Sequence, residues 1–97
     1  VIDLTNRASE ELKKILESKK TSKPLRIYIA GMVGGPTFGI ALDEHKEGDI
    51  ETKVEDFVFL VDEILQENFQ KFTIDYNDGW LRKGFTVIPD GLQPGSC

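Results

Sequence analysis

The segment near the N-terminus carries hydrophobic residues at the spacing of an amphipathic helix. Its apolar positions recur every three or four residues with charged side chains between them, and they are Ala8, Leu12, Ile15 and Leu16. Thr5 precedes them as an N-cap, and Pro24 disfavours a helical conformation for the residue before it. We therefore expect a helix over residues 6–20, with Glu10 and Lys14 paired one turn apart on its exposed face.

Beyond this helix the pattern changes to the period of two that is typical of strands. Segments rich in β-branched and aromatic residues are separated by polar or glycine-containing turns. They are residues 25–30, 37–43, 50–56, 57–62, 72–76 and 84–88. Asp62 can cap a short helix over residues 63–70, between the fourth and fifth segments. Because a parallel crossover needs a dozen or more residues, we expect a largely antiparallel or mixed sheet.

These elements predict a single α+β domain over residues 1–97 that is mostly β. The density of strands favours short mixed strands in a distorted barrel-like sandwich, with the N-terminal helix packed outside. The last stretch, about residues 89–97, contains two prolines and two glycines. We expect it to be a flexible C-terminal tail.

Composition limits the classes of partner. The chain is 39% hydrophobic and 30% charged, which is typical of a soluble globular domain. Its net charge is −5, and it has no cluster of Lys and Arg interleaved with aromatic residues, so we expect no nucleic-acid partner. The longest apolar run, residues 57–61, is too short for a membrane span, and no signal-peptide segment is present. Cys97 is the single cysteine, which excludes an intrachain disulfide and favours a cytoplasmic location.

The sequence contains no histidine in a setting that suits a catalytic base. His45 is the only histidine, and it lies in the acidic segment "DEHKEGD", where we expect a solvated turn. A hydrolase of the Ser/His/Asp or Cys/His type needs a positioned base, so we expect no enzyme. A cation site is the alternative interpretation of this segment, although its acidic residues lack the spacing of a calcium loop: Asp43, Glu44, Glu47 and Asp49.

The glycine-rich segment "GMVGGPTFG", residues 31–39, lies between two predicted strands. A phosphate-binding loop would open a helix, whereas here a strand follows, and Pro36 lacks the amide that a phosphate cradle uses. We interpret the glycines as a tight turn that needs positive φ angles and close backbone approach.

Trp80 and Cys97 each have two interpretations. Trp80 either packs against the core beside a hairpin or serves as a platform for a ligand or partner, and we expect core packing. Cys97 is either an incidental thiol near the C-terminus or a soft ligand for a metal.

Four segments follow one another in a fixed order nearly from one end of the chain to the other: "IDLTNRASEELKKIL", "LRIYIAGMVGGPTFGIALDE", "FVFLVDEILQENFQKFTIDYNDG" and "GFTVIPDG". In this order the chain resembles the HesB/IscA family, the A-type carriers of iron–sulfur cluster biogenesis. The form "GGP-x-F-G-x-x-LDE" is similar to a HesB-like branch of that family. The resemblance implies a HesB-like domain with a distorted, mostly β fold.

Family members typically hold iron or a cluster with three cysteines, one in the glycine-rich turn and two in a Cys-Gly-Cys near the C-terminus. Aligning the turn places Val33 at the first of these positions, so the chain lacks the turn cysteine. Cys97 lies 64 residues further on, which matches the second position. Thiolates suit iron because they are the donors that clusters require.

The resemblance therefore implies a scaffold or carrier in iron–sulfur cluster biogenesis. It would bind iron or a cluster through Cys97, with ligands from a partner chain. Its implied partners are a second copy of the chain, in a homodimer, and proteins that donate or accept clusters. The alternative is a metal-free interaction module that keeps the fold but has lost the cluster site. In that case Met32, Val33 and Phe38 would form an apolar patch at the turn.

Overall fold

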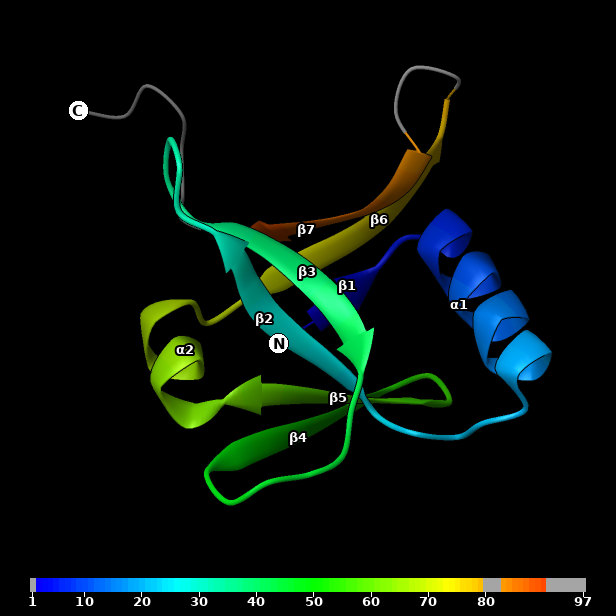
Figure 1. Cartoon of the computed structure of the whole chain (residues 1–97), viewed down its shortest axis with the longest axis horizontal. Coiled ribbons are helices and arrows are strands. Elements are labelled where there is room, and N and C mark those ends of the chain that lie inside the picture. Colours follow the sequence, from blue (N-terminus) through cyan, green and yellow to red (C-terminus); the bar gives the residue numbers. More distant parts are fainter. Residues whose placement is uncertain (1, 80–82, 91–97) are drawn as a thin grey trace.

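The computed structural model describes residues 2–79 and 83–90 (Figure 1). Trp80 and Cys97 lie outside these residues, so the core packing expected of Trp80 and the metal role of Cys97 stay predictions. The described elements are β1 Ile2–Leu4, α1 Asn6–Lys19, β2 Leu25–Gly31, β3 Thr37–Leu42, β4 Asp49–Val54, β5 Phe57–Asp62, α2 Glu63–Asn68, β6 Phe72–Asp78 and β7 Lys83–Pro89. The six predicted strands are all present, and β1 is an additional strand.

The N-terminal helix α1 is built as its sequence predicts. The Thr5 hydroxyl accepts a hydrogen bond from the Ala8 amide at 3.2 Å, which satisfies a free amide of the first turn. Lys20 caps the other end in a left-handed conformation, with φ of 49°. Lys14 pairs with Glu11 at 3.5 Å in place of the expected Glu10. Both partners are within reach, because residues three and four positions apart are neighbours on a helix surface.

The strands form one mixed sheet in the order β1-β6-β7-β3-β2-β5-β4. The β1–β6 and β2–β5 pairs are parallel, and the others are antiparallel. Between β2 and β5 the chain passes through β3 and β4, so the parallel pair forms without a crossover helix. Strand β4 comes near β1, and the sheet nearly closes on itself. The expected mostly β fold, with barrel-like strands and an outer helix, is confirmed.

The core lies inside this curved sheet and beneath α1. The helix contributes Ala8 and Leu12 to it and packs mainly against β6 (Figure 1). The largest fully buried side chains are Phe59, Phe72, Leu12, Ile27, Leu60, Ile74 and Val61. Neither helix of the described residues is long and apolar enough to cross a membrane.

One end of the molecule gathers the elements that matter for the candidate site. The turn between β2 and β3, the helix α2, the start of β6 and the end of β7 all lie there (Figure 1). Asp62 caps α2 as predicted, and its carboxylate accepts a hydrogen bond from the Ile64 amide at 2.9 Å. The glycine-rich turn projects from this end of the sheet as the tip of a hairpin.

Candidate functional site

The glycine-rich turn forms the tip of the β2–β3 hairpin. The Gly35 amide donates a hydrogen bond to the Met32 carbonyl at 3.1 Å, which closes the turn. Gly34 and Gly35 have φ angles of 74° and 115°, in the region that glycine adopts without strain. The interpretation of this segment as a tight turn is therefore confirmed, and β3 follows it where a phosphate-binding loop would open a helix.

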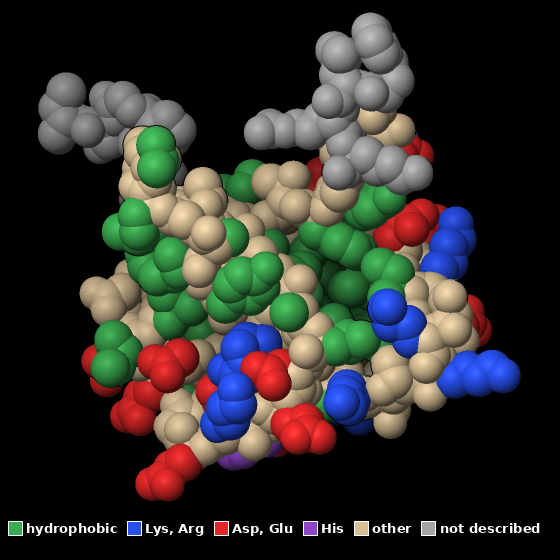
Figure 2. All heavy atoms as spheres, viewed as in Figure 1, with side chains coloured by type: hydrophobic (Ala, Val, Ile, Leu, Met, Phe, Trp, Pro, Cys, Tyr) green, Lys and Arg blue, Asp and Glu red, His purple; other side chains and the backbone are tan. Residues whose placement is uncertain are grey.

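The tip exposes apolar side chains. Val33 is 98% exposed and Met32 is 66% exposed. Exposing such apolar side chains to water is unfavourable in free energy. Ile29 is 44% exposed, whereas its strand neighbour Ile27 is buried, because Ile27 lies opposite Val61 and β5 does not extend beside Ile29. Together Ile29, Met32 and Val33 form an apolar surface, called here the apolar tip. In Figure 2 hydrophobic side chains gather along the side of the molecule where this hairpin projects.

Phe38 does not belong to the apolar tip, so that part of the predicted patch is wrong. Its side chain is only 8% exposed. It lies opposite Ile29 on one side and Val87 on the other, and its ring contacts Phe69 and Phe72 at centroid distances of 5.1 and 5.3 Å. Phe38 thus packs the base of the hairpin against the core and does not contribute to the exposed tip.

The acidic segment is occupied by an internal cation. The Arg26 guanidinium donates two hydrogen bonds to Asp49, at 2.7 and 2.6 Å, and one to Asp43 at 2.6 Å. It also donates to the Glu44 carbonyl at 3.2 Å. These hydrogen bonds from Arg26 are the main cause that lowers the pKa of Asp43 and of Asp49 to about 2.

The Arg26 cluster, meaning Arg26 with Asp43 and Asp49, makes a cation site in this segment unnecessary. Its two carboxylates neutralise a side chain of the protein itself, and the Asp49 side chain is only 3% exposed. His45 is exposed, as expected of a solvated turn. Sequence reasoning missed this cluster. The sequence feature that could have predicted it is Arg26, a charged residue on β2. This strand pairs with β3, which leads directly into the acidic segment.

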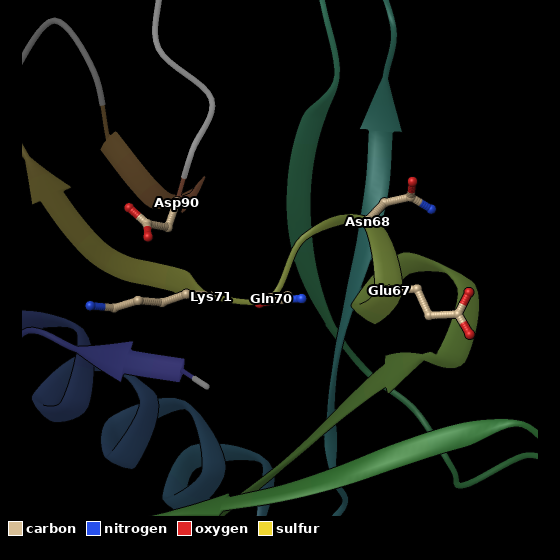
Figure 3. A pocket seen from close by; sticks show the side chains of 5 residues that line it. All are labelled: Glu67, Asn68, Gln70, Lys71 and Asp90. Atoms are coloured by element: carbon tan, nitrogen blue, oxygen red, sulfur yellow. The ribbon is translucent and has the colours of Figure 1, made fainter.

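A polar hollow of about 430 Å³ lies where α2, β6 and β7 meet, close to the base of the hairpin. Glu67, Asn68, Gln70, Lys71 and Asp90 line it. In Figure 3 the Glu67 and Asn68 side chains point away from Asp90, and Lys71 points toward β1, where it pairs with Asp3 at 3.1 Å. The side chains diverge, so they do not form a ligand set.

The described residues do not fit an iron–sulfur cluster by themselves. Val33 carries no donor atom at the position that the resemblance gives to the first cysteine. Among residues 2–79 and 83–90, no group of three or more His, Cys, Asp and Glu side chains could hold a metal ion. A cluster site in this protein would therefore need donor atoms from outside the described residues.

The end of β7 lies beside the hairpin. Val87 is opposite Phe38, and β7 runs antiparallel to β3, so its chain direction is toward the tip. The strand continues to Pro89, which lies opposite Phe72, and the Asp90 amide then donates to the Lys71 carbonyl at 2.8 Å. The chain thus leaves the sheet at the end where the hairpin tip projects.

No protein-family model matches the chain, and no curated protein matches its sequence. Solved structures do match. The crystal structure of IscA with a [2Fe–2S] cluster is 20% identical, covers 98% of this chain and 92% of its own, and has a TM-score of 0.76. The chain has the IscA fold.

Two further structures agree with this fold. Escherichia coli SufA, described as involved in the biosynthesis of iron–sulfur clusters, is 18% identical over 99% of this chain and 85% of its own, with a TM-score of 0.71. A protein from Aquifex aeolicus is 24% identical over 90% of this chain and 89% of its own, with a TM-score of 0.69. The resemblance to the HesB/IscA family is confirmed for the fold, and sites and activities do not follow from a fold alone.

Proposed function

We propose that the protein is a scaffold or carrier in iron–sulfur cluster assembly and has no catalytic turnover. The observation that carries this proposal is the IscA fold, which extends over 98% of the chain and is known in a structure that holds a [2Fe–2S] cluster. In this proposal Cys97 is the ligand that the chain supplies, and iron or a cluster is the cargo.

The position of β7 supports the participation of Cys97. The chain leaves the sheet at Asp90, beside the hairpin, and Cys97 follows seven residues later. Seven residues span at most about 23–25 Å when fully extended. Val33 lies only five residues before Phe38, which is opposite Val87, so seven residues are long enough for Cys97 to reach the hairpin tip. The resemblance places the first cysteine there, at Val33.

The ligand count requires a second chain. An iron–sulfur cluster is usually held by four thiolates, whereas this chain has one cysteine. A homodimer supplies two thiolates, and glutathione or a client protein supplies the rest. Proteins that donate or accept clusters are then the natural partners, and a reducing cytoplasm is the compartment that keeps Cys97 available.

Anaerobic reconstitution with ferrous iron and sulfide, in the presence of glutathione, tests this function. We expect sulfur-to-iron charge-transfer absorption in the visible range for the parent protein. Ser96→Ala is the matched control, since it changes the neighbouring residue and leaves the thiol in place. Absorption that is absent from the parent, or that persists unchanged in Cys97→Ser, contradicts the proposal.

The second candidate function is a metal-free interaction module. The apolar tip favours it, because Val33 is 98% exposed where a ligand cysteine would be expected. A ligand that binds only the folded state raises the melting temperature by mass action. A melting temperature that does not respond to iron or zinc, together with dimerisation that depends on protein concentration, would support the module in place of the carrier.

A further inference from the structure

An apolar groove lies between α1 and β3, at the opposite end of β3 from the hairpin tip. Its volume is about 210 Å³. Leu12 and Leu25 lie at its base and are almost fully buried, and Ile15, Ile40 and Leu42 form half-buried walls. Figure 2 shows a hollow with hydrophobic walls between the centre of the view and α1, with Lys or Arg side chains at its border. We call this hollow the α1–β3 groove.

The groove exists because α1 covers only part of the sheet. The helix packs mainly against β6, where Ala8 and Leu12 are buried. Ile40 and Leu42 alternate with the exposed Ala41 and face the core side, yet both keep partial exposure at the end of β3. These side chains therefore offer apolar surface whose burial by another molecule would be favourable.

Lys19 gives the groove a charged border. It lies in the last turn of α1, is exposed and lines the groove. The ion pairs found within residues 2–79 and 83–90 do not include it. The groove thus combines an apolar cleft with a cation that has no carboxylate partner in the described part of the chain, and it complements a group that is apolar with a negative charge beside it.

The size of the groove indicates the kind of occupant. Sites for small molecules usually enclose about 300–1,000 Å³, which is more than this groove offers. A pocket of about 210 Å³ instead suits one bulky side chain, and such anchors carry much of the energy of protein interfaces.

We propose that the α1–β3 groove docks an extended segment of a partner protein, with a bulky apolar side chain in the cleft and an adjacent Asp or Glu paired with Lys19. The groove is remote from the hairpin tip, and this docking does not require iron. The proposal therefore stands independently of the carrier function.

Methyl NMR on the full chain tests the groove with three blocked peptides in a Gly/Ser background. The first contains leucine followed by glutamate, the second leucine followed by glutamine, and the third alanine followed by glutamate. We expect the first peptide to shift the methyl signals of Ile15, Ile40 and Leu42 in a saturable way at millimolar concentration. The glutamine peptide should bind about threefold more weakly, as for loss of an exposed ion pair. The alanine peptide should not saturate.

Charge reversal in the protein completes the test. Lys19→Glu should abolish the preference for glutamate over glutamine, whereas Lys13→Glu, the same change on an exposed part of α1 outside the groove, should keep it. The proposal is overturned if the leucine peptides shift no groove methyl, or if the shifts centre on Ile29 at the hairpin. It is also overturned if both charge reversals act alike, or if octanoate saturates the groove while the leucine peptides do not, which would assign it to a small amphiphile.

Discussion

Arg26 shows how single charged residues determine the conformation of a connection that sequence patterns describe only as polar. Its guanidinium holds Asp43 at the end of β3 and Asp49 at the start of β4, 2.6 Å from each. The segment between these two residues is therefore fixed at both ends to β2. A cluster of acidic residues that resembles a cation site in the sequence is instead one half of an internal ion network.

Removing the guanidinium should destabilise the protein measurably. In Arg26→Met the Asp49 carboxylate, 3% exposed, would lose its charged partner. The carboxylate would keep only the hydrogen bond from the Lys46 amide, at 2.7 Å. Leaving a buried acceptor without its main partner costs about 1–3 kcal/mol, and we expect the free energy of unfolding to fall by this amount in urea titrations at neutral pH. Lys23→Met is the control, because Lys23 and Glu44 form an exposed pair at 4.0 Å. Equal stability of the two variants would contradict this role of Arg26.

The same network predicts how stability depends on pH. The pKa of Asp43 and of Asp49 is lowered to about 2 from an ordinary value of 3.8. The unfolded chain therefore binds protons first, so the stabilisation is complete above about pH 4 and is lost as the pH falls toward 2. Urea unfolding at several values between pH 5 and pH 2 should show a steeper loss for the parent than for Arg26→Met. Parallel curves for the two proteins would show that the pKa shifts have another cause.

Val33 provides the test of the site at the scale of one residue. Val33→Cys would place a thiolate on the exposed tip, within reach of Cys97, and a dimer of this variant would offer four thiolates. We expect more iron bound per chain than in the parent after reconstitution, and a 33–97 disulfide under mild oxidation. Val33→Ser is the control, since it makes the tip polar without adding a thiol. If neither extra iron nor a crosslink is found, Cys97 does not visit the tip.

At the scale of elements, the hydrophobic pattern of the sequence predicted the helices and strands that depend mainly on local periodicity. Helix α1 and six strands followed from periodicity, because each buries one face or one stripe against the core. Strand β1 escaped prediction because three residues are too few to show a period, and its pairing with β6 joins segments about seventy residues apart. Phe38 was misplaced for a similar reason, since only its pairing with Ile29 and Val87 shows which way it points.

Thr5 joins two of these elements, and its removal should therefore cost more than a change at the helix surface. Its hydroxyl accepts from the Ala8 amide and donates to the Asp75 carboxylate at 2.7 Å. Loss of an N-cap costs about 1 kcal/mol, so Thr5→Ala should lower the free energy of unfolding by about that amount. Thr5→Ser keeps the hydroxyl and should retain most of the stability in the same chemical denaturation experiment. A Thr5→Ala protein as stable as Thr5→Ser would exclude the hydroxyl from this role.

At the scale of the whole molecule, the fold and the candidate site differ in how far the sequence could predict them. An ordered set of segments predicted the IscA fold, which the structure confirms. The proposed cluster site rests on Cys97 and on a second chain, and the contacts within residues 2–79 and 83–90 test neither. The Cys97 site stays a prediction because Cys97 lies outside the described residues and the proposed second chain is absent from a single chain's contacts.

Native mass spectrometry of the anaerobically reconstituted protein tests this assembly most directly. A carrier that supplies one thiolate per chain should appear as a dimer with the added mass of one cluster and of any glutathione ligands. The Cys97→Ser variant should lack the cluster mass. Parent protein that carries no iron and sulfide, or a cluster mass retained in Cys97→Ser, would contradict the proposal that Cys97 holds a cluster between two chains.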